Sequence, residues 1–324
     1  MNDSEIVLIL SSIVLASSPI IIAVCGETIT ERSGVINLSL DGTMLMSAMT
    51  GFVVAFTFNN IWLGFLAGAL VGAFFAFIVA FGSIRLNQSQ VAIGFVLTLL
   101  GDDLSAFLGQ NYTRLPGPTV TRVGIPFLKD LPIIGPIIFD QDIVVYFAFI
   151  LVAVSWWFLN RTQPGLHLRG SGERPEAAFA RGVHVNRVRY IYTIAGGALV
   201  GIAGAAYSLN VKIGWSDGHT RGFGWIVLDI VIFGGWSPVK GALGALLFGA
   251  TKALATILQR TFPEVPVVLF NALPWLMMIF VLLVAGSNAT ERLVVLMPKR
   301  TRPRLRRWLR VQPPMALGTT FGEE

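Results

Sequence analysis

The sequence predicts an all-α bundle of membrane-spanning helices, about seven to ten in number, with at least one helix broken inside the membrane. Hydrophobic residues make up 54% of the 324-residue chain and charged residues only 13%, and the mean hydropathy is +0.70. A soluble domain carries about 25% charged residues, and one core could not bury this much apolar surface. The surplus is therefore expected to face lipid.

Apolar stretches long enough to cross a bilayer, about 20 residues each, define the candidate spans. Another stretch, 224–258, is apolar but interrupted at 234–238 by Gly-Gly-Trp-Ser-Pro, which predicts a half-helix over 224–236 and a longer helix over 240–258. Broken backbone at membrane depth often marks a substrate path. The seven uninterrupted candidates are 6–25, 38–56, 62–83, 91–109, 142–159, 190–211 and 266–286.

Lysine and arginine set the predicted orientation, because cytoplasmic loops carry an excess of both. Most of the 24 positive residues share a side with the C-terminus. This places the loop 160–189 and the basic tail 291–324 in the cytoplasm, and the N-terminus and the loop 110–141 outside, provided that 26–37 is a loop. We expect one multi-pass domain, 1–290, in the inner membrane. The tail is expected to touch anionic lipid, and the net charge of +6 indicates no nucleic-acid partner.

The cytoplasmic loop contains one short predicted helix, Pro175 to Gly182. Proline suits the first helical position, Glu176 suits the positive helix end, and Gly182 suits the stop. A helix of about two turns is marginal alone in water. It should therefore pack against something, with Phe179 as an apolar contact. Its support could come from the chain's own helix ends or from a partner.

Several motifs resemble a known family. Glu176-Ala177-Ala178, three residues and then Gly182 resemble the EAA loop of ABC importer permeases. The stretches 31–42, 170–190 and 222–238 resemble sugar and nucleoside-type permeases, a group related to the branched-chain amino-acid permeases. Two residues depart from the family pattern: Asp41 stands where Glu is more frequent, and Thr98 stands where Asn is frequent.

The resemblance implies a type II ABC importer fold and a permease that carries a nucleoside or a simple sugar. It implies three protein partners: an ATPase subunit, a second permease chain, identical or homologous, and an external solute-binding protein. It also implies that the predicted helix is a coupling helix that docks into the ATPase, formed by Pro175, Glu176, Ala177, Ala178, Phe179, Arg181 and Gly182.

Polar and aromatic residues in the predicted spans are candidates for the translocation path. An ionised residue in a spanning helix costs roughly 2.5–3.5 kcal/mol, so each needs a reason. Asp41 could cap the second span, and Asp229 in the half-helix is the leading polar candidate. Aromatic rings could stack on a nucleobase or sugar, or form the interfacial belt. The candidate path residues are Asn37, Asp41, Gln90, Thr98, Trp215, Phe223, Trp225 and Asp229.

The sequence favours neither an enzyme nor a metalloprotein. It lacks a phosphate loop, so ATP is expected on the partner ATPase and no cofactor on this chain. The three histidines, His167, His184 and His219, are scattered, and Cys25 is the single cysteine, so no metal site is expected. One alternative remains open. Asp41, Asp102, Asp103 and Asp229 could bind a coupling ion in a secondary transporter, a class that also uses broken helices.

Overall fold

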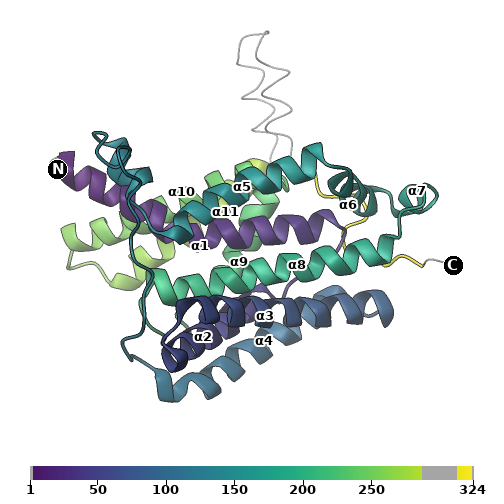
Figure 1. Ribbon diagram of the computed structural model, residues 1–324, viewed down its shortest axis with the longest axis horizontal. Helices are drawn as coiled ribbons and strands as arrows, with labels where there is room; N and C mark the ends of the chain where they lie inside the picture. Colours follow the sequence, from purple (N-terminus) through teal and green to yellow (C-terminus); the bar gives the residue numbers. More distant parts are fainter. Residues whose placement is uncertain (1–2, 287–311, 323–324) are drawn as a thin grey trace, which may run out of the picture.

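The computed structural model describes residues 3–286 and 312–322, which form a bundle of long helices (Figure 1). Within these residues, β-structure is limited to isolated bridges. Seven helical segments are long and apolar enough to cross a membrane, which confirms the predicted all-α, multi-pass class. Each of these segments contains one long helix. The helices are α1 (Asp3–Arg32), α2 (Leu40–Phe58), α3 (Ile61–Ala80), α4 (Gln90–Gly109), α5 (Ile143–Arg161), α8 (Val185–Ala206) and α10 (Pro238–Thr261).

Shorter elements complete the bundle. The predicted broken segment is present: α9 (Phe223–Phe233) is too short to cross, and α10 restarts at Pro238 after the turn at 234–237. The last predicted span is α11 (Val267–Gly286). Two helices, α6 (Gln163–Glu173) and α7 (Pro175–Phe179), lie in the loop between α5 and α8. Single turns of other helix types are η1 (Phe81–Arg85), η2 (Gln110–Tyr112), η3 (Gly135–Phe139) and η4 (Tyr207–Val211).

The first span is longer than predicted, and the expectation of a loop over 26–37 is wrong for most of that stretch. Helix α1 continues to Arg32, and only 33–39 is non-helical. Polar residues beyond position 25 made the helix look finished, but Glu27 and Glu31 are both buried by packing. Gly26 lies inside the helix, where its missing side chain allows close contact with Gly196 of α8. Tertiary packing therefore overrides the local polarity of the sequence.

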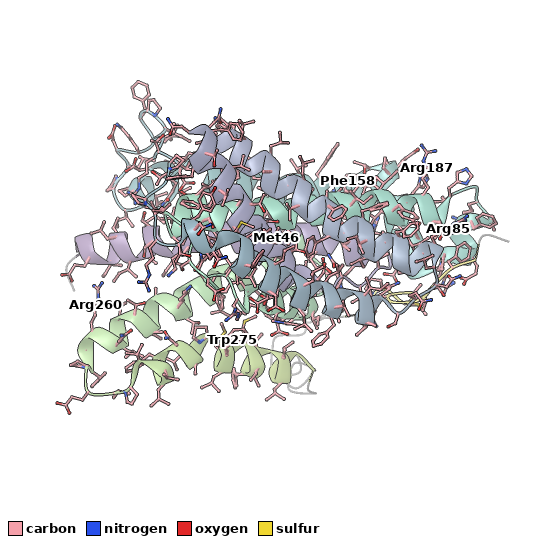
Figure 2. The ribbon with its side chains drawn as sticks, turned by 90° about the horizontal axis from the view of Figure 1, so that it is seen from below. Met46, Arg85, Phe158, Arg187, Arg260 and Trp275 are labelled. Carbon is pink, nitrogen blue, oxygen red and sulfur yellow. The ribbon has the colours of Figure 1, made fainter. Side chains whose placement is uncertain are left out.

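The ends of the bundle are chemically distinct. The N-terminus and the loop 110–141 lie at one end, and α6, α7 and residues 312–322 lie at the other (Figure 1). Figure 2 shows Arg85 and Arg187 at the α7 end and Arg260 at the opposite end. This separation agrees with the predicted grouping of positive residues, which placed Arg85 and Arg187 on one side and Arg260 on the other. The predicted tail, 291–324, lies outside the described residues except for 312–322.

Helices α3 and α8 pack along a seam of small residues. Helix α3 has a glycine every fourth position, so its glycines share one face. Small residues let helix backbones approach closely, which stabilises helix pairs in membranes through packing. An added Cβ on Gly201 would overlap the main-chain oxygen of Gly68, and one on Gly72 would overlap that of Gly197. The residues of the seam are Gly68, Gly72, Ala76, Gly197, Gly201 and Ala205.

Candidate functional site

The connection between α1 and α2, residues 33–39, is non-helical and mostly buried. Non-helical backbone inside a membrane protein needs side-chain partners for its polar groups. Gln90 of α4 accepts a hydrogen bond from Ile36 N–H at 2.7 Å. Thr98, two turns along α4, donates its hydroxyl proton to Leu38 O at 2.7 Å. Both predicted path residues thus hold this connection in place.

A buried polar cluster surrounds the same connection. Asn37 is fully buried and accepts hydrogen bonds from the main-chain N–H and the hydroxyl of Ser39. Glu27 and Glu31, one turn apart on α1, are both buried, and Glu27 lies near the backbone of Asn37. The Glu31 carboxylate accepts a hydrogen bond from the indole N–H of Trp236, in the break between α9 and α10. The break is therefore tied to the end of α1.

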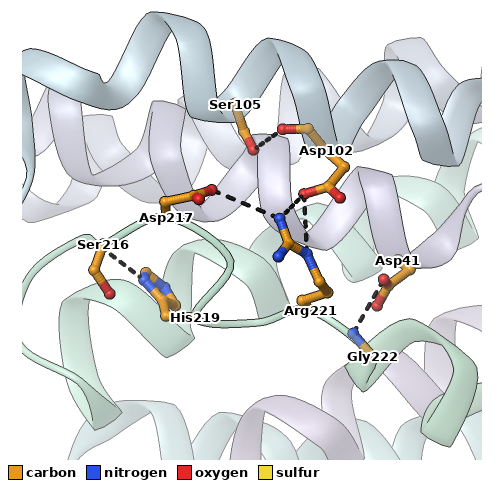
Figure 3. A network of polar contacts seen from close by, with 8 residues as sticks. All are labelled: Asp41, Asp102, Ser105, Ser216, Asp217, His219, Arg221 and Gly222. Carbon is orange, nitrogen blue, oxygen red and sulfur yellow. Dashed lines mark hydrogen bonds and ion pairs between the residues drawn. The ribbon is translucent and has the colours of Figure 1, made fainter.

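The carboxylate of Asp41 caps α9, not α2 as the sequence suggested (Figure 3). It accepts Gly222 N–H, at the N-cap of α9, at 3.0 Å and Gly224 N–H, in the first turn, at 2.9 Å. A carboxylate there satisfies free amides and meets the positive end of the helix dipole. Gly222 has φ +89°, and an added Cβ on Gly224 would overlap the Asp41 backbone. Asp229 lies further along α9 and is half-buried.

A charged network lies beside this cap (Figure 3). The guanidinium of Arg221 pairs with Asp102 of α4 at 2.7 Å and with Asp217 at 3.8 Å. The hydrogen bond to Asp102 raises the pKa of Arg221, so this side chain is charged at neutral pH. The Arg221 side chain is 54% exposed, so the pair adds little stability. Among the described residues, no three His, Cys, Asp or Glu side chains converge to hold a metal ion.

An aromatic cluster forms where α8, α9 and α10 meet. The ring of Tyr207 stacks on His219 at 5.6 Å between centroids and meets Phe223 edge-on at 4.8 Å. The Lys252 ammonium lies 4.5 Å from the Phe223 ring centroid and 3.2 Å from the Tyr207 hydroxyl. Of these four residues, only Phe223 was predicted from the sequence as a residue of the path. Lys252, near the middle of the apolar helix α10, was the available signal for the others, since such charges usually face the bundle interior.

The remaining predicted aromatic residues are also packed inside. The Trp215 side chain is 3% exposed and lies among α2, α4 and α8, against Phe52, Leu209 and the backbone of Gly109. Trp225 is partly buried against the main core. Phe223 is 9% exposed and belongs to the same main core as Trp225, whereas Trp215 lies in a separate cluster, so all three rings are packed inside the protein.

Acidification is expected to loosen the loop 212–222. The ring of His219 accepts Ser216 N–H at Nδ1, so the neutral ring carries its proton on Nε2 and donates to the Ser208 hydroxyl. Burial lowers the pKa of His219 from 6.5 to about 4, with a smaller effect from Lys212. As pH falls, the unfolded chain therefore binds a proton at His219 before the folded protein does. The stability that the neutral His219 contributes is fully present above pH 6.5 and is lost as pH falls toward 4. Melting temperatures across this range measure the loss.

The variant His219→Asn is the control for this pH effect. Its amide oxygen can still accept from Ser216 N–H, but the side chain does not titrate. The melting temperature of the variant should fall less than that of the parent protein between pH 6.5 and pH 4. Parallel curves for the two proteins would show that His219 does not govern the acid sensitivity.

The predicted coupling helix is present but shorter than two turns. Helix α7 ends at Phe179, and Gly182, with φ +84°, closes the following turn by donating its N–H to Phe179 O. Pro175 is at the first helical position, as expected. Pro175 and Ala178 are buried against the protein, whereas Glu176, Ala177, Phe179 and Arg181 are exposed.

A chain of polar contacts runs from this loop to the break in the membrane. Glu173, at the end of α6, forms an ion pair with Arg32 at 3.5 Å. The same arginine donates from Nε to Trp236 O at 3.0 Å and from a terminal nitrogen to Gly235 O at 3.5 Å. Arg32 therefore bridges the α6–α7 loop and the end of α9. Helix α6 was not predicted, because its residues are mostly polar or glycine.

Comparison with known proteins identifies the relatives of this chain. A family model described as a branched-chain amino acid transport system / permease component matches residues 9–282. A putative glucose ABC transporter permease protein of Haloferax volcanii is 40% identical over 76% of this chain and 76% of its own length. A nucleoside ABC transporter permease protein of Lactococcus lactis is 32% identical over 85% of this chain and 91% of its own length. A guanosine ABC transporter permease protein of Bacillus subtilis is 33% identical over 86% of this chain and 93% of its own length. No solved structure gives a significant match.

Proposed function

Because this chain belongs to the family of branched-chain amino acid transport system permease components, we propose that it is the membrane subunit of an ATP-driven importer for nucleosides or simple sugars. The named solutes of its relatives, glucose, nucleosides and guanosine, support this solute class. The family consists of ABC transporter permeases, which does not favour the ion-coupled secondary transporter. The import direction is part of the proposal.

Three protein partners follow from this assignment. An ATPase subunit, which binds the ATP, docks on α7 in the cytoplasm. A second permease chain, identical or homologous, completes the translocation path, and an external binding protein delivers the solute to the opposite end. The C-terminus is cytoplasmic and the protein lies in the inner membrane, as the distribution of positive residues favours.

The contact chain through Arg32 is the observation that supports this mechanism most directly. A movement of the α6–α7 loop would displace Glu173 and, through Arg32, the main chain at Gly235 and Trp236. These residues end α9, and Asp41 holds the start of the same helix. Helix α9 thus connects the ATPase end with the polar network of Arg221, and its tilt would open or close the path.

The solute is proposed to pass along α9 and its surroundings. Asp229 would accept hydrogen bonds from solute hydroxyls. The rings of Trp215, Phe223 and Trp225 would present an apolar face to a base or sugar. Asn37, Asp41, Gln90 and Thr98 would shape the path by fixing the backbone of 33–39 and the start of α9, in agreement with their hydrogen bonds.

Two substitutions in the coupling loop are expected to uncouple the permease from its ATPase. Glu176→Arg reverses a charge on the exposed face of α7, and Gly182→Pro removes the N–H that closes the turn and forbids its positive φ. When the tagged permease is co-expressed with its partner ATPase, we expect co-elution of the ATPase to fall at least about tenfold, since 1.4 kcal/mol of lost binding suffices for this. Uptake of labelled nucleoside or glucose should fall with it.

Glu264→Arg is the matched control, because it makes the same charge reversal on an exposed residue between α10 and α11, at the opposite end of the molecule. It should leave co-elution unchanged. Co-elution that survives both loop substitutions would contradict the coupling role of α7. The melting temperature and the monodispersity of each detergent-extracted variant are measured in parallel. A variant that is no longer monodisperse has a folding defect, and its loss of co-elution is not counted as uncoupling.

A further inference from the structure

The C-terminal segment, residues 312–322, returns to the coupling loop. Ala316 N–H donates to Gly172 O at 2.9 Å, and Gly318 N–H donates to Gly34 O at 3.0 Å. Met315 N–H lies 3.4 Å from the carboxylate of Glu173. The segment thus bonds to the connection after α1 and to the end of α6, where Glu173 also pairs with Arg32.

A buried arginine makes this segment an integral part of the fold. Arg189 of α8 is 1% exposed. Its guanidinium donates to Thr319 O at 2.7 Å and to Ser171 O at 3.2 Å. Gly34, with φ +100°, leaves room for it, since an added Cβ there would lie 2.8 Å from a guanidinium nitrogen. A buried charge is costly unless it is hydrogen-bonded, so the carbonyl of Thr319 provides a partner that Arg189 needs.

The segment ends on the coupling helix itself. The ring of Phe321 lies 5.8 Å from the ring of Phe179, centroid to centroid, at an interplanar angle of 62°. Phe179 is still 39% exposed, and Phe321 is partly exposed. A protein that covers the exposed face of α7 therefore meets both rings, because they form one continuous apolar surface.

We propose that the ATPase docks on a composite surface made of α7 and Phe321 at the end of the C-terminal segment, with the rings of Phe179 and Phe321 as its paired apolar anchor. This inference rests on the proposed function and extends it to a part of the chain outside the coupling loop. Aromatic residues at the centre of an interface commonly dominate binding. The hydrogen bonds of the segment to the α6–α7 loop hold Phe321 in position for this contact.

Alanine substitutions in the full-length permease test the surface. The affinity of the purified ATPase for the detergent-solubilised permease is measured for Phe321→Ala, for Phe179→Ala and for the double variant. Each single variant should bind the ATPase roughly tenfold more weakly. The affinity of the double variant should fall by less than the product of the two single decreases, because the two rings contribute to one contact. The melting temperature of the permease should hardly change.

Met315→Ala is the matched control, because Met315 is an apolar residue of the same segment whose side chain is 74% exposed. It should bind the ATPase as the parent protein does. Full affinity of Phe321→Ala, or equal weakening by Met315→Ala, would overturn the composite surface. If Phe179→Ala and Glu176→Arg weaken binding and Phe321→Ala does not, the inference alone fails. If none of these weakens binding, the proposed function fails with it.

Discussion

Replacing Gly201 by leucine is expected to prevent the helices α3 and α8 from packing. The position of a Cβ on Gly201 already overlaps the Gly68 main-chain oxygen and lies 3.0 Å from the Gly72 Cα. Backbone cannot move aside as a flexible side chain can, so the helices must separate along their seam. We expect a loss of at least about 3 kcal/mol of stability, at the upper end of overpacking costs. The yield of monodisperse protein in detergent and its melting temperature measure the effect.

The graded variant Gly201→Ala should lower the melting temperature less than leucine does. Its matched control is Gly170→Ala in α6, where an added Cβ makes only an ordinary contact at 3.6 Å with Ala178. Alanine favours helices over glycine by about 1 kcal/mol, so the control should be neutral or slightly stabilising. A Gly201→Leu protein as stable as the parent would show that the α3–α8 seam is not closely packed.

Hydropathy and composition predicted the architecture well, because the bilayer imposes strong rules. The position of each long span followed from its length and apolarity, and the break at 234–237 followed from two glycines and a proline in an apolar stretch. The arginine distribution predicted which loops share an end, as Figure 2 shows for Arg85 and Arg187. These features depend on local sequence alone.

The polar contacts could not be predicted, because they join residues far apart in the chain. Asp41 precedes Gly42 at the start of α2, so capping of α2 was the natural interpretation, yet its partners lie near position 222. Glu27 and Glu31 share one face of α1, at a spacing of four residues. That spacing was the available signal for a buried polar cluster, but it was hidden by ending the span at residue 25.

The loop 160–189 shows what the sequence can and cannot predict. Its Glu-Ala-Ala motif and its proline were visible, and α7 lies where they indicated. The segment 312–322, which completes the surface around it, carries no motif and follows a basic stretch typical of a tail. Only the three-dimensional contacts with Gly172, Gly34 and Arg189 show that it belongs to the fold.

Replacing Asp41 by alanine is expected to abolish transport while the bundle still assembles. The change leaves two buried N–H groups, of Gly222 and Gly224, without their acceptor, at a cost of roughly 1–3 kcal/mol each. It also removes a negative charge from the positive end of α9. Asp41 holds the start of α9, and the contacts with Arg32 hold its end. Without Asp41, the start of the helix would no longer be fixed when its end is moved. We expect uptake below about a tenth of the parent rate.

Two variants separate this role from a general loss of polarity. Asp41→Asn keeps one acceptor oxygen but not the charge, so its uptake should lie between those of the parent and Asp41→Ala. Asp103→Asn neutralises an exposed aspartate next to Asp102 on α4 and should transport normally. ATPase co-elution should survive in all three, since the coupling loop is unchanged. Full uptake by Asp41→Ala would mean that the cap of α9 is dispensable, and the path would then have to open by the movement of another helix.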